Sequence, residues 1–275
     1  MDDTQLVTRI IEIAQRASDA ILKIYHNVNI EVSIKSDNSP LTSADLASDS
    51  VIKAGLRELD LGYPVLTEET AEMAYQKRKE WKRFWLVDPL DGTKEFIKRN
   101  GEFTINIALI ENNTPILGVV HVPVLDTCYY GTASAGAYVR KGSELDKQIK
   151  VRQLCPNESV LVVTSRSHAD QRTEALLEFL GRHECISMGS SLKLCAVAEG
   201  SAHFYPRLGP TMEWDTAAAH AIVSAAGGRV CDITGVELSY NKPDLHNPEF
   251  FVLPKNDDFL LKVAKQCLNV GVPHE

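Results

Sequence analysis

Residues 85–97 read Trp-Leu-Val-Asp-Pro-Leu-Asp-Gly-Thr-Lys-Glu-Phe-Ile. The apolar start predicts a buried strand, and the carboxylates of Asp88 and Asp91 are expected on the turn that follows it. Pro89 restricts φ and lacks an N–H group, whereas Gly92 allows backbone conformations that most side chains exclude. Oxygen ligands on a rigid turn suit a hard cation such as Mg²⁺. The same residue types are also the commonest in ordinary turns, so this segment alone leaves both interpretations open.

The hydrophobic periodicity of the remaining chain predicts an α+β first half and an α/β second half. Before residue 150 we expect helices over 5–25 and 42–59, and strands over 30–34, 64–66, 84–87, 103–110, 116–124, 128–130 and 137–140. After it we expect helices over 170–180, 192–199 and 215–226, and strands over 159–164, 203–205, 228–231 and 250–253. The charged residues 141–150 are typical of an exposed connection. We therefore predict two subdomains, residues 1–150 and 151–275.

The composition limits the classes of partner and compartment. Lys and Arg number 29 against 37 Asp and Glu, so the net charge of −8 argues against binding a nucleic-acid polymer. The six cysteines form no Cys-x-x-Cys pair, the histidines lack zinc-ligand spacing, and no apolar stretch would span a bilayer. We expect a cytoplasmic protein without a secretory leader or a transmembrane segment. Peripheral association with the cytoplasmic face of the inner membrane stays open, as does the choice between monomer and dimer.

Four further acids stand where predicted strands end or predicted helices begin. Glu68 and Glu69 follow a short apolar strand, and Asp45 and Asp215 each stand at a helix start. Taken singly, Asp45 and Asp215 are explained as N-caps, and the glutamates as a solvated loop pair. Taken together, these acids gather where an α/β fold builds its crevice, and a like-charge cluster there would need cations.

Three separated elements in this order resemble the signature of the lithium-sensitive, Mg²⁺-dependent phosphatases. They are Glu68-Glu69, Asp88 to Thr93, and Trp214-Asp215 followed by Gly227-Gly228. This superfamily includes inositol monophosphatase, fructose-1,6-bisphosphatase and 3′(2′),5′-bisphosphate nucleotidase. The resemblance implies the layered αβαβα sugar-phosphatase fold, with the active site between two subdomains.

Other segments are similar to the bacterial bisphosphate nucleotidase branch of that superfamily. They are the continuation of the opening segment to Phe103, Ser165 to His168, Gly189 to Lys193, and Tyr205 to Arg207. One departure is Ala219-His220, where many relatives carry Gly-His; this change should not touch the ligands.

The resemblance implies a site for two or three Mg²⁺ ions. Glu68, Asp88 and the backbone carbonyl of Leu90 would bind the first ion. Asp88, Asp91 and Asp215 would bind the second, and Glu69 would stand behind these ligands. Two ions about 4 Å apart can activate a water and stabilise the leaving oxygen. The first subdomain would then carry most of the metal ligands, and the second would contribute Asp215.

Catalytic and substrate roles follow from the same resemblance. Asp45 and Thr93 would orient the attacking water, with Glu68 as a third catalytic residue. The amides of Gly92 and Thr93 would hold the phosphate. The substrate-binding residues would be Glu68, Leu90, Asp91, Gly92, Thr93, Lys94, His168, Ser190, Lys193, Arg207 and Asp215. From the residues alone, Lys193 is more readily explained as an exposed helix residue and His168 as a helix cap.

The predicted function is hydrolysis of the 3′-phosphate of adenosine 3′,5′-bisphosphate to AMP and phosphate, linked to sulfur assimilation. An inositol or sugar phosphate phosphatase is the nearest alternative, because the metal site would be shared. A metal- and nucleotide-binding sensor without turnover is an alternative of another class. Inhibition by Li⁺ is expected from the resemblance.

Overall fold

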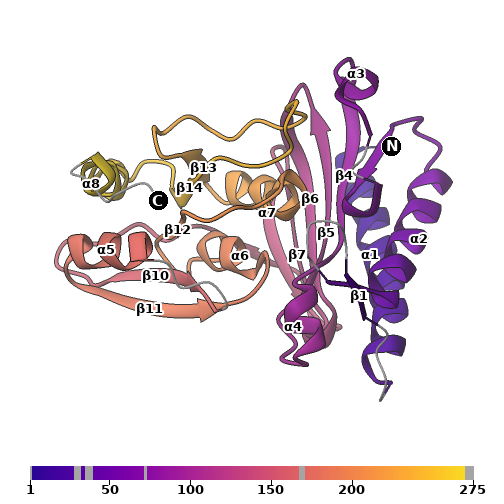
Figure 1. Ribbon diagram of the computed structural model, residues 1–275, viewed down its shortest axis with the longest axis horizontal. Coiled ribbons are helices and arrows are strands. Elements are labelled where there is room, and N and C mark those ends of the chain that lie inside the picture. The colour runs from indigo at the N-terminus through magenta and orange to yellow at the C-terminus, as the bar shows by residue number, and fades with distance from the viewer. Residues whose placement is uncertain (1, 28–31, 35–39, 71–72, 167–170, 270–275) are drawn as a thin grey trace.

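The computed structural model describes residues 2–27, 32–34, 40–70, 73–166 and 171–269. Helices and sheets alternate in layers, in the order helix, sheet, helix, sheet and helix (Figure 1). The predicted layered α/β architecture is therefore confirmed. Among the described residues, every helix is too short or too polar to cross a bilayer.

The first half builds one large sheet. Its seven strands lie side by side in chain order, and only the first pair is parallel. The strands are β3 (Val65–Thr67), β4 (Arg83–Asp91), β5 (Thr104–Glu111), β6 (Thr114–Val122), β7 (Thr127–Thr132), β8 (Gly136–Lys141) and β9 (Lys147–Ile149). Strand β9 lies inside the stretch 141–150, so the prediction that this stretch is only an exposed connection was wrong in part.

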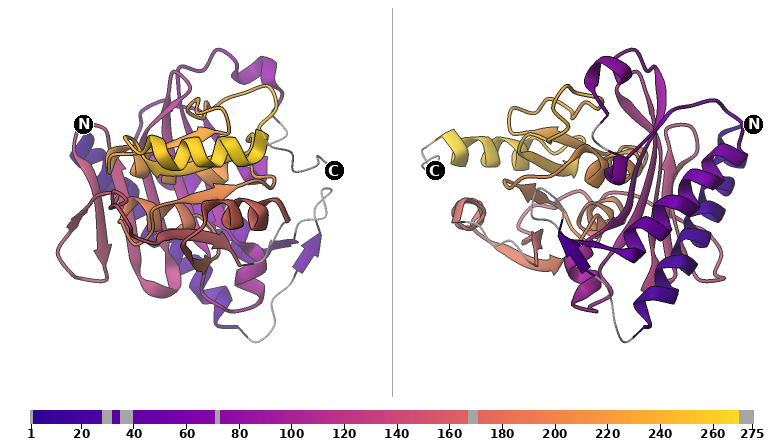
Figure 2. Two further views of the ribbon diagram at one scale, coloured as in Figure 1. Left: turned by 90° about the vertical axis from the view of Figure 1, so that its left-hand side faces the viewer. Right: turned by 45° about the vertical axis from the view of Figure 1, so that its right-hand side comes forward.

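Two long helices cover one face of this sheet, and Figure 2 shows them packed side by side. Helix α1 (Asp3–Tyr25) and helix α2 (Ser43–Glu58) follow the predicted ranges closely. Helix α1 turns apolar residues at steps of three and four toward the sheet, which is the pattern that predicted it. Short elements complete this half: β1 (Val32–Ile34), β2 (Pro40–Thr42), the 3₁₀ turns η1 (Glu68–Thr70) and η2 (Pro123–Leu125), α3 (Tyr75–Arg78) and α4 (Thr93–Ile97).

The second half builds a smaller mixed sheet. A parallel pair, β10 (Val160–Ser165) and β11 (His183–Met188), lies beside an antiparallel set of β12 (Tyr205–Arg207), β14 (Phe250–Pro254) and β13 (Gly228–Asp232). A bridge between Val162 and Phe204 joins the two groups. Helices α5 (Gln171–Leu180) and α8 (Asp258–Asn269) lie side by side on the outer face (Figure 2). Strand β11 and helix α8 were not predicted.

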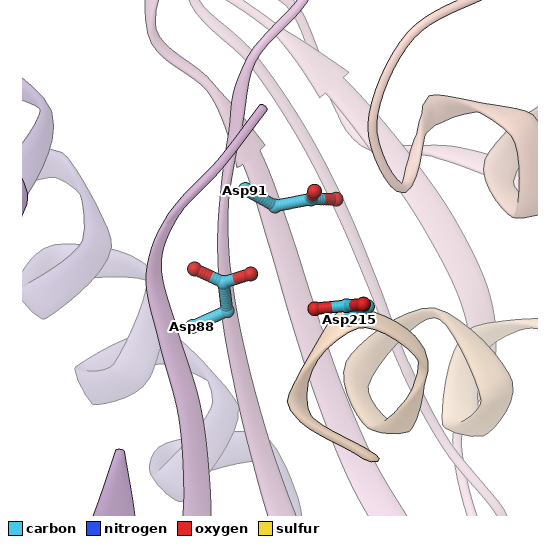
Figure 3. Close-up of side chains that lie close together, drawn as sticks. All are labelled: Asp88, Asp91 and Asp215. Carbon is cyan, nitrogen blue, oxygen red and sulfur yellow. The ribbon is translucent and has the colours of Figure 1, made fainter. Parts of the chain in front are cut away.

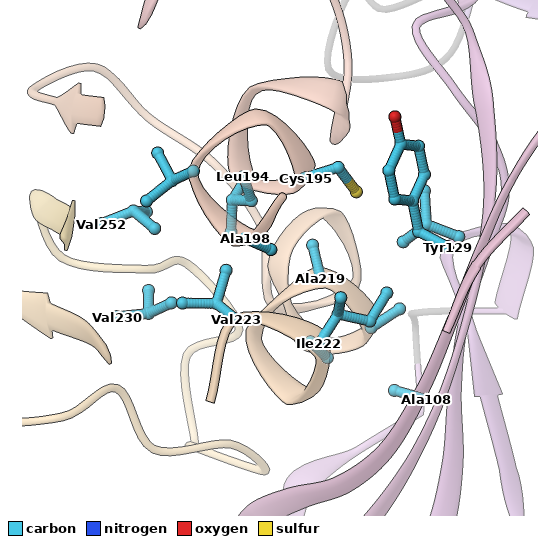
Figure 4. Close-up of a cluster of buried hydrophobic side chains, with 14 of the residues drawn as sticks. Ala108, Tyr129, Leu194, Cys195, Ala198, Ala219, Ile222, Val223, Val230 and Val252 are labelled. Carbon is cyan, nitrogen blue, oxygen red and sulfur yellow. The ribbon is translucent and has the colours of Figure 1, made fainter. Parts of the chain in front are cut away.

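Helices α6 (Leu192–Ala198) and α7 (Glu213–Ala225) lie between the two sheets. Figure 4 shows Ile222 of α7 facing the first sheet and Val223 facing the strands of the second. Gly118 of β6 allows α7 to approach the sheet closely, because a Cβ added at this glycine would lie 2.0 Å from the carbonyl oxygen of Ala218. This contact fixes the height of α7, and therefore of Asp215, over the first sheet.

The two sheets divide the chain near the predicted boundary. Strands of the first sheet end at Ile149, and strands of the second begin at Val160. One apolar core includes side chains from both sheets together with α6 and α7. The division into subdomains 1–150 and 151–275 as separate units stays a prediction.

Candidate active site

A bulge in strand β4 brings its two aspartates to one face. The strand runs on to Asp91, so the turn predicted from Asp88 onward begins only at Gly92. Asp88 pairs with Asn106 and Asp91 with Thr104, so three steps on β4 match two on β5. Residues three apart on a regular strand face opposite sides, and the extra residue restores the same side. Pro89 cannot donate a ladder hydrogen bond, which suits it to such an irregularity.

Asp88, Asp91 and Asp215 converge at one point. Each offers a carboxylate oxygen, and these oxygens all lie within 4.8 Å of one another. Figure 3 shows Asp88 and Asp91 on the strand and Asp215 approaching from the start of α7. Asp88 is buried, while the other two are partly exposed. Residues from the two halves of the chain therefore form one acidic cluster.

The cluster is electrostatically unfavourable on its own. Burial raises the pKa of Asp88 well above its usual range, and the nearby charges of Glu68, Asp91 and Asp215 raise it further. Burial also raises the pKa of Asp215, with the charge of Asp91 next and that of Glu68 adding to it. Glu68, at the start of η1, therefore belongs to the same electrostatic group. A hard divalent cation with oxygen ligands fits this donor set, because it would offset the repulsion.

The backbone around the bulge is held by specific hydrogen bonds. The Leu90 N–H donates to Asp88 Oδ1 at 3.0 Å. The Ser48 hydroxyl of α2 donates to the Pro89 carbonyl at 2.7 Å, which ties the bulge to the helix layer. The Leu90 carbonyl, predicted as a ligand, has the Thr93 hydroxyl at 3.5 Å. Hydrogen bonds therefore restrain the bulged backbone around Leu90.

Asp45 stabilises the start of helix α2 and also contacts Thr93 at the candidate active site. Its Oδ2 accepts hydrogen bonds from the Thr42 backbone N–H at 2.8 Å and the Thr42 hydroxyl at 2.6 Å. Its Oδ1 accepts one from the Thr93 hydroxyl at 3.2 Å. Asp45 is thus the third residue of a capping box rather than the N-cap itself, which is Thr42. Asp215 has the corresponding position on α7, accepting from the Met212 N–H at 2.8 Å.

A cavity of about 740 Å³ opens beside the cluster, between the two halves. Several predicted substrate residues line it: Asp91, Gly92, Thr93, Lys94, Ser190, Lys193, Arg207 and Asp215. Its further lining includes Tyr205, Thr211, His246 and Phe250, which the prediction did not include. Predicted residues Glu68 and Leu90 are not in this lining, and His168 lies outside the described residues.

Lys193 is a buried cation at this cavity. Its side chain is 9% exposed, so the alternative of an exposed helix residue was wrong. The ammonium donates to the Ser190 carbonyl at 2.6 Å and lies 5.8 Å from the centre of the Tyr205 ring. Burial lowers the pKa of Lys193 to about 8. Arg207, the second predicted cation, donates to the Pro210 carbonyl at 2.8 Å.

Two serines that precede α6 contact the cluster directly. The hydroxyl oxygens of Ser190 and Ser191 lie 2.7 and 2.9 Å from Asp91 Oδ2, within hydrogen-bond distance. Ser190 has φ of 53°, in the left-handed region, so the loop holds it in a costly conformation. The prediction included Ser190 and missed Ser191.

Other polar residues at the site were also missed. Thr104 and Asn106 on β5 contact Ser190 and Ser191, respectively. The sequence could have indicated Thr104 and Asn106, because these two polar residues at alternate positions interrupt the apolar run 103–110. Glu102 accepts hydrogen bonds from Nε and Nη2 of Arg166, each at 2.7 Å, and from the Gly189 N–H at 2.8 Å. No sequence motif predicts the contact between Glu102 and the Gly189 N–H.

Known proteins are similar to this chain in both sequence and fold. The profile of the Inositol monophosphatase family matches residues 2–269. The chain is 49% identical over 249 residues to the 3′(2′),5′-bisphosphate nucleotidase CysQ of Escherichia coli (strain K12), covering 90% of this chain and 99% of that protein. It is 34% identical to the protein of the same name from Aggregatibacter actinomycetemcomitans, over 93% of this chain and 95% of the relative. The crystal structure of CysQ from Bacteroides thetaiotaomicron is 43% identical, covers 92% of this chain and 98% of that one, and superposes with a TM-score of 0.81. The resemblance predicted from the sequence is confirmed, and the chain belongs to the inositol monophosphatase family.

Proposed function

We propose that this protein hydrolyses the 3′-phosphate of adenosine 3′,5′-bisphosphate to AMP and phosphate. The observation that carries the proposal is the convergence of Asp88, Asp91 and Asp215 beside a cavity with a buried lysine. The relatives named above as 3′(2′),5′-bisphosphate nucleotidases support this choice of substrate. The predicted link to sulfur assimilation depends on this substrate and stays a prediction.

The proposed cofactor is Mg²⁺, two or three ions per site. Glu68, Asp88 and the Leu90 carbonyl would hold one ion, and Asp88, Asp91 and Asp215 another. When bound, the ions would supply positive charge that acidifies the attacking water and stabilises the phosphoryl oxygens. The raised pKa of Asp88, caused by burial and by neighbouring carboxylates, supports this assignment.

Thr93 and Asp45 are proposed to orient the attacking water. The Thr93 hydroxyl donates its proton to Asp45 Oδ1, which leaves its lone pairs available to accept a hydrogen bond from water. Asp45 is held by the helix cap at its other oxygen, so the acceptor cannot swing away. Glu68 is the third proposed catalytic residue, and the amides of Gly92 and Thr93 are proposed to contact the phosphate.

The second phosphate is proposed to bind at the cationic wall of the cavity. Lys193 and Arg207 are the candidates, because both line the cavity and each can donate to phosphate oxygens. A volume of about 740 Å³ is within the range of small-molecule sites and large enough for more than one phosphate group. Ser190 and Lys94 line the same space and complete the proposed substrate contacts, together with the prediction for His168.

The test is phosphate release from adenosine 3′,5′-bisphosphate and from inositol phosphate, each with and without Mg²⁺. We expect Mg²⁺-dependent release that is faster with the nucleotide, and inhibition by Li⁺. Preference for inositol phosphate would favour the second candidate, an inositol or sugar phosphate phosphatase. Binding of nucleotide without any release would favour the non-catalytic sensor. Sedimentation of the same sample would distinguish monomer from dimer.

A further inference from the structure

Ser191 is a buried hydroxyl between the two elements that carry the acidic cluster. It precedes α6 and is 1% exposed. Its Oγ lies 2.9 Å from Asp91 Oδ2, 2.7 Å from the backbone carbonyl oxygen of Asp215, and 2.8 Å from Asn106 Nδ2. Figure 3 shows that Asp91 and Asp215 approach each other from opposite layers. One hydroxyl therefore contacts both.

The protons of this contact can be assigned. The Asn106 amide nitrogen can only donate, so Ser191 Oγ accepts the hydrogen bond from Asn106. The single proton of Ser191 is then left for two acceptors, the Asp91 carboxylate and the Asp215 carbonyl. The Asn106 Oδ1 lies 3.0 Å from the Thr104 hydroxyl, and its Nδ2 therefore faces Ser191. The hydrogen bonds therefore run from Asn106 to Ser191, and from Ser191 to the acidic cluster.

The contact also spans the fold. Asn106 lies on β5 and Asp91 on β4, both in the first sheet, whereas Asp215 lies on α7 in the helix layer. Pairs of residues 85 and 100 positions apart meet at Ser191. Ser190 Oγ lies 2.7 Å from the same Asp91 oxygen, so Oδ2 has two serine hydroxyls within hydrogen-bond distance. These bonds restrain the Asp91 carboxylate to one orientation.

We propose that Ser191, oriented by Asn106, is a positioning residue: it holds the Asp91 carboxylate beside the backbone of Asp215 at the start of α7, and so sets the separation of these two acids for binding a divalent cation. This inference rests on the proposed metal site and adds to it Ser191 and Asn106, neither of which is a proposed metal ligand. Polar partners behind metal ligands typically change metal affinity or activity by about 10- to 100-fold when removed.

The first experiment measures Mn²⁺ binding by calorimetry, with no substrate present. In Ser191→Ala we expect a Kd about 10- to 100-fold above that of the wild type. Turnover should fall at low Mg²⁺ and recover as Mg²⁺ is raised, because the ligands themselves remain. A Kd equal to that of the wild type would overturn the inference.

A matched control removes a buried hydroxyl elsewhere. Ser18 is 4% exposed on α1, on the other side of the first sheet. Ser18→Ala should bind Mn²⁺ as the wild type does. If it weakens binding equally, loss of general stability explains the effect and Ser191 has no special role.

A double-mutant cycle tests the chain of hydrogen bonds. Asn106→Leu should weaken Mn²⁺ binding, because the hydroxyl of Ser191 loses the donor that orients it. Combining it with Ser191→Ala should add little, since both changes interrupt one chain. Fully additive losses would contradict the proposed order of action.

Two outcomes separate this inference from the proposed function. If the wild type fails to bind Mn²⁺ at all, the metal site itself is refuted. If the wild type binds and Ser191→Ala binds equally well, only the positioning role is refuted. Unfolding measured in EDTA checks that Ser191→Ala folds. If Ser191→Ala does not fold, Ser191→Cys takes its place, because a thiol has a similar volume and is a weaker hydrogen-bond donor. A Kd equal to that of the wild type in Ser191→Cys would again overturn the inference.

Discussion

The Thr93 hydroxyl donates to Asp45 Oδ1 at 3.2 Å and joins the start of α4 to the first turn of α2. The two residues are 48 positions apart, so only the packing of α2 beside β4 brings them together. A residue of the helix-capping box thus also has a hydrogen bond at the candidate active site. Its role in turnover can be tested separately from its role in the cap.

Removal of the Thr93 hydroxyl should affect turnover and leave metal binding intact. In Thr93→Ala we expect kcat to fall by about 10²- to 10⁴-fold, the usual contribution of a positioned proton-transfer group. Thr93→Ser keeps the hydroxyl and should retain most activity. The measurement is steady-state phosphate release at saturating Mg²⁺. Wild-type turnover in Thr93→Ala would refute the assignment.

Neutralising Asp88 should stabilise the metal-free protein while abolishing its activity. Burial raises the pKa of Asp88 above its ordinary value of 3.8, with nearby carboxylates adding to it. The ionised Asp88 carboxylate therefore destabilises the metal-free fold increasingly as pH rises from 3.8 toward the higher pKa of the folded state. In EDTA at pH 7, Asp88→Asn should raise the free energy of unfolding by about 1–2 kcal/mol.

Urea unfolding with and without Mg²⁺ checks this prediction. The wild type should gain stability on adding Mg²⁺, because a ligand that binds only the folded state stabilises it. Asp88→Asn should gain much less. Asp19→Asn, at an exposed position on α1, is the control and should behave as the wild type. A metal-free Asp88→Asn protein that is less stable than the wild type would contradict the electrostatic account.

Lys193 should contribute to affinity for the second phosphate rather than to the chemical step. In Lys193→Met we expect KM for adenosine 3′,5′-bisphosphate to rise by about 10- to 100-fold, since hydrogen bonds to charged groups are worth about 1.5–3 kcal/mol. The KM for adenosine 3′-monophosphate, which lacks that group, should change far less. Lys98→Met, at an exposed position after α4, is the control. Equal losses with both substrates would argue against this role.

Buried neutral histidines should make the fold sensitive to acid. Burial lowers the pKa of His220 to about 4, from 6.5, and its Nδ1 lies 2.9 Å from the Tyr240 hydroxyl. Between these values the unfolded chain binds a proton that the folded chain does not. Stability is therefore full above pH 6.5 and is lost as pH falls toward 4.

The measurement compares the free energy of unfolding at pH 7 and pH 5. His220 should contribute about 1–2 kcal/mol to the loss in the wild type. His220→Gln, which keeps a polar partner for Tyr240, should show a smaller loss. His26→Gln, at an exposed position, should match the wild type. An unchanged pH dependence in His220→Gln would contradict the prediction.

The elements predicted well are those whose burial repeats along the chain. Helix α1 turns a regular set of apolar residues inward, and strand β5 is buried along nearly its whole length, so an apolar pattern or run predicts each of them. Strand β11 does not, because none of its residues is fully buried and polar side chains alternate irregularly. Helix α8 has buried Leu260, Leu261 and Ala264 at helical spacing, so this helix was predictable from the sequence.

The sequence by itself determined the local parts of the site. Asp45 and Asp215 cap their own helices over three residues, and Gly92 allows the left-handed turn that begins α4. These contacts depend on neighbours along the chain. The order of the motifs was enough to predict the family, and with it the acids.

Only the tertiary structure decided which of these groups meet. The bulge in β4 turns Asp88 and Asp91 to one side, and the close contact of α7 with Gly118 sets the height of Asp215. The Ser191 hydroxyl then joins Asp91 to Asp215 across two layers. Periodicity along a chain reports which face of an element is buried, but not which distant element covers it. The site is therefore a product of packing between layers.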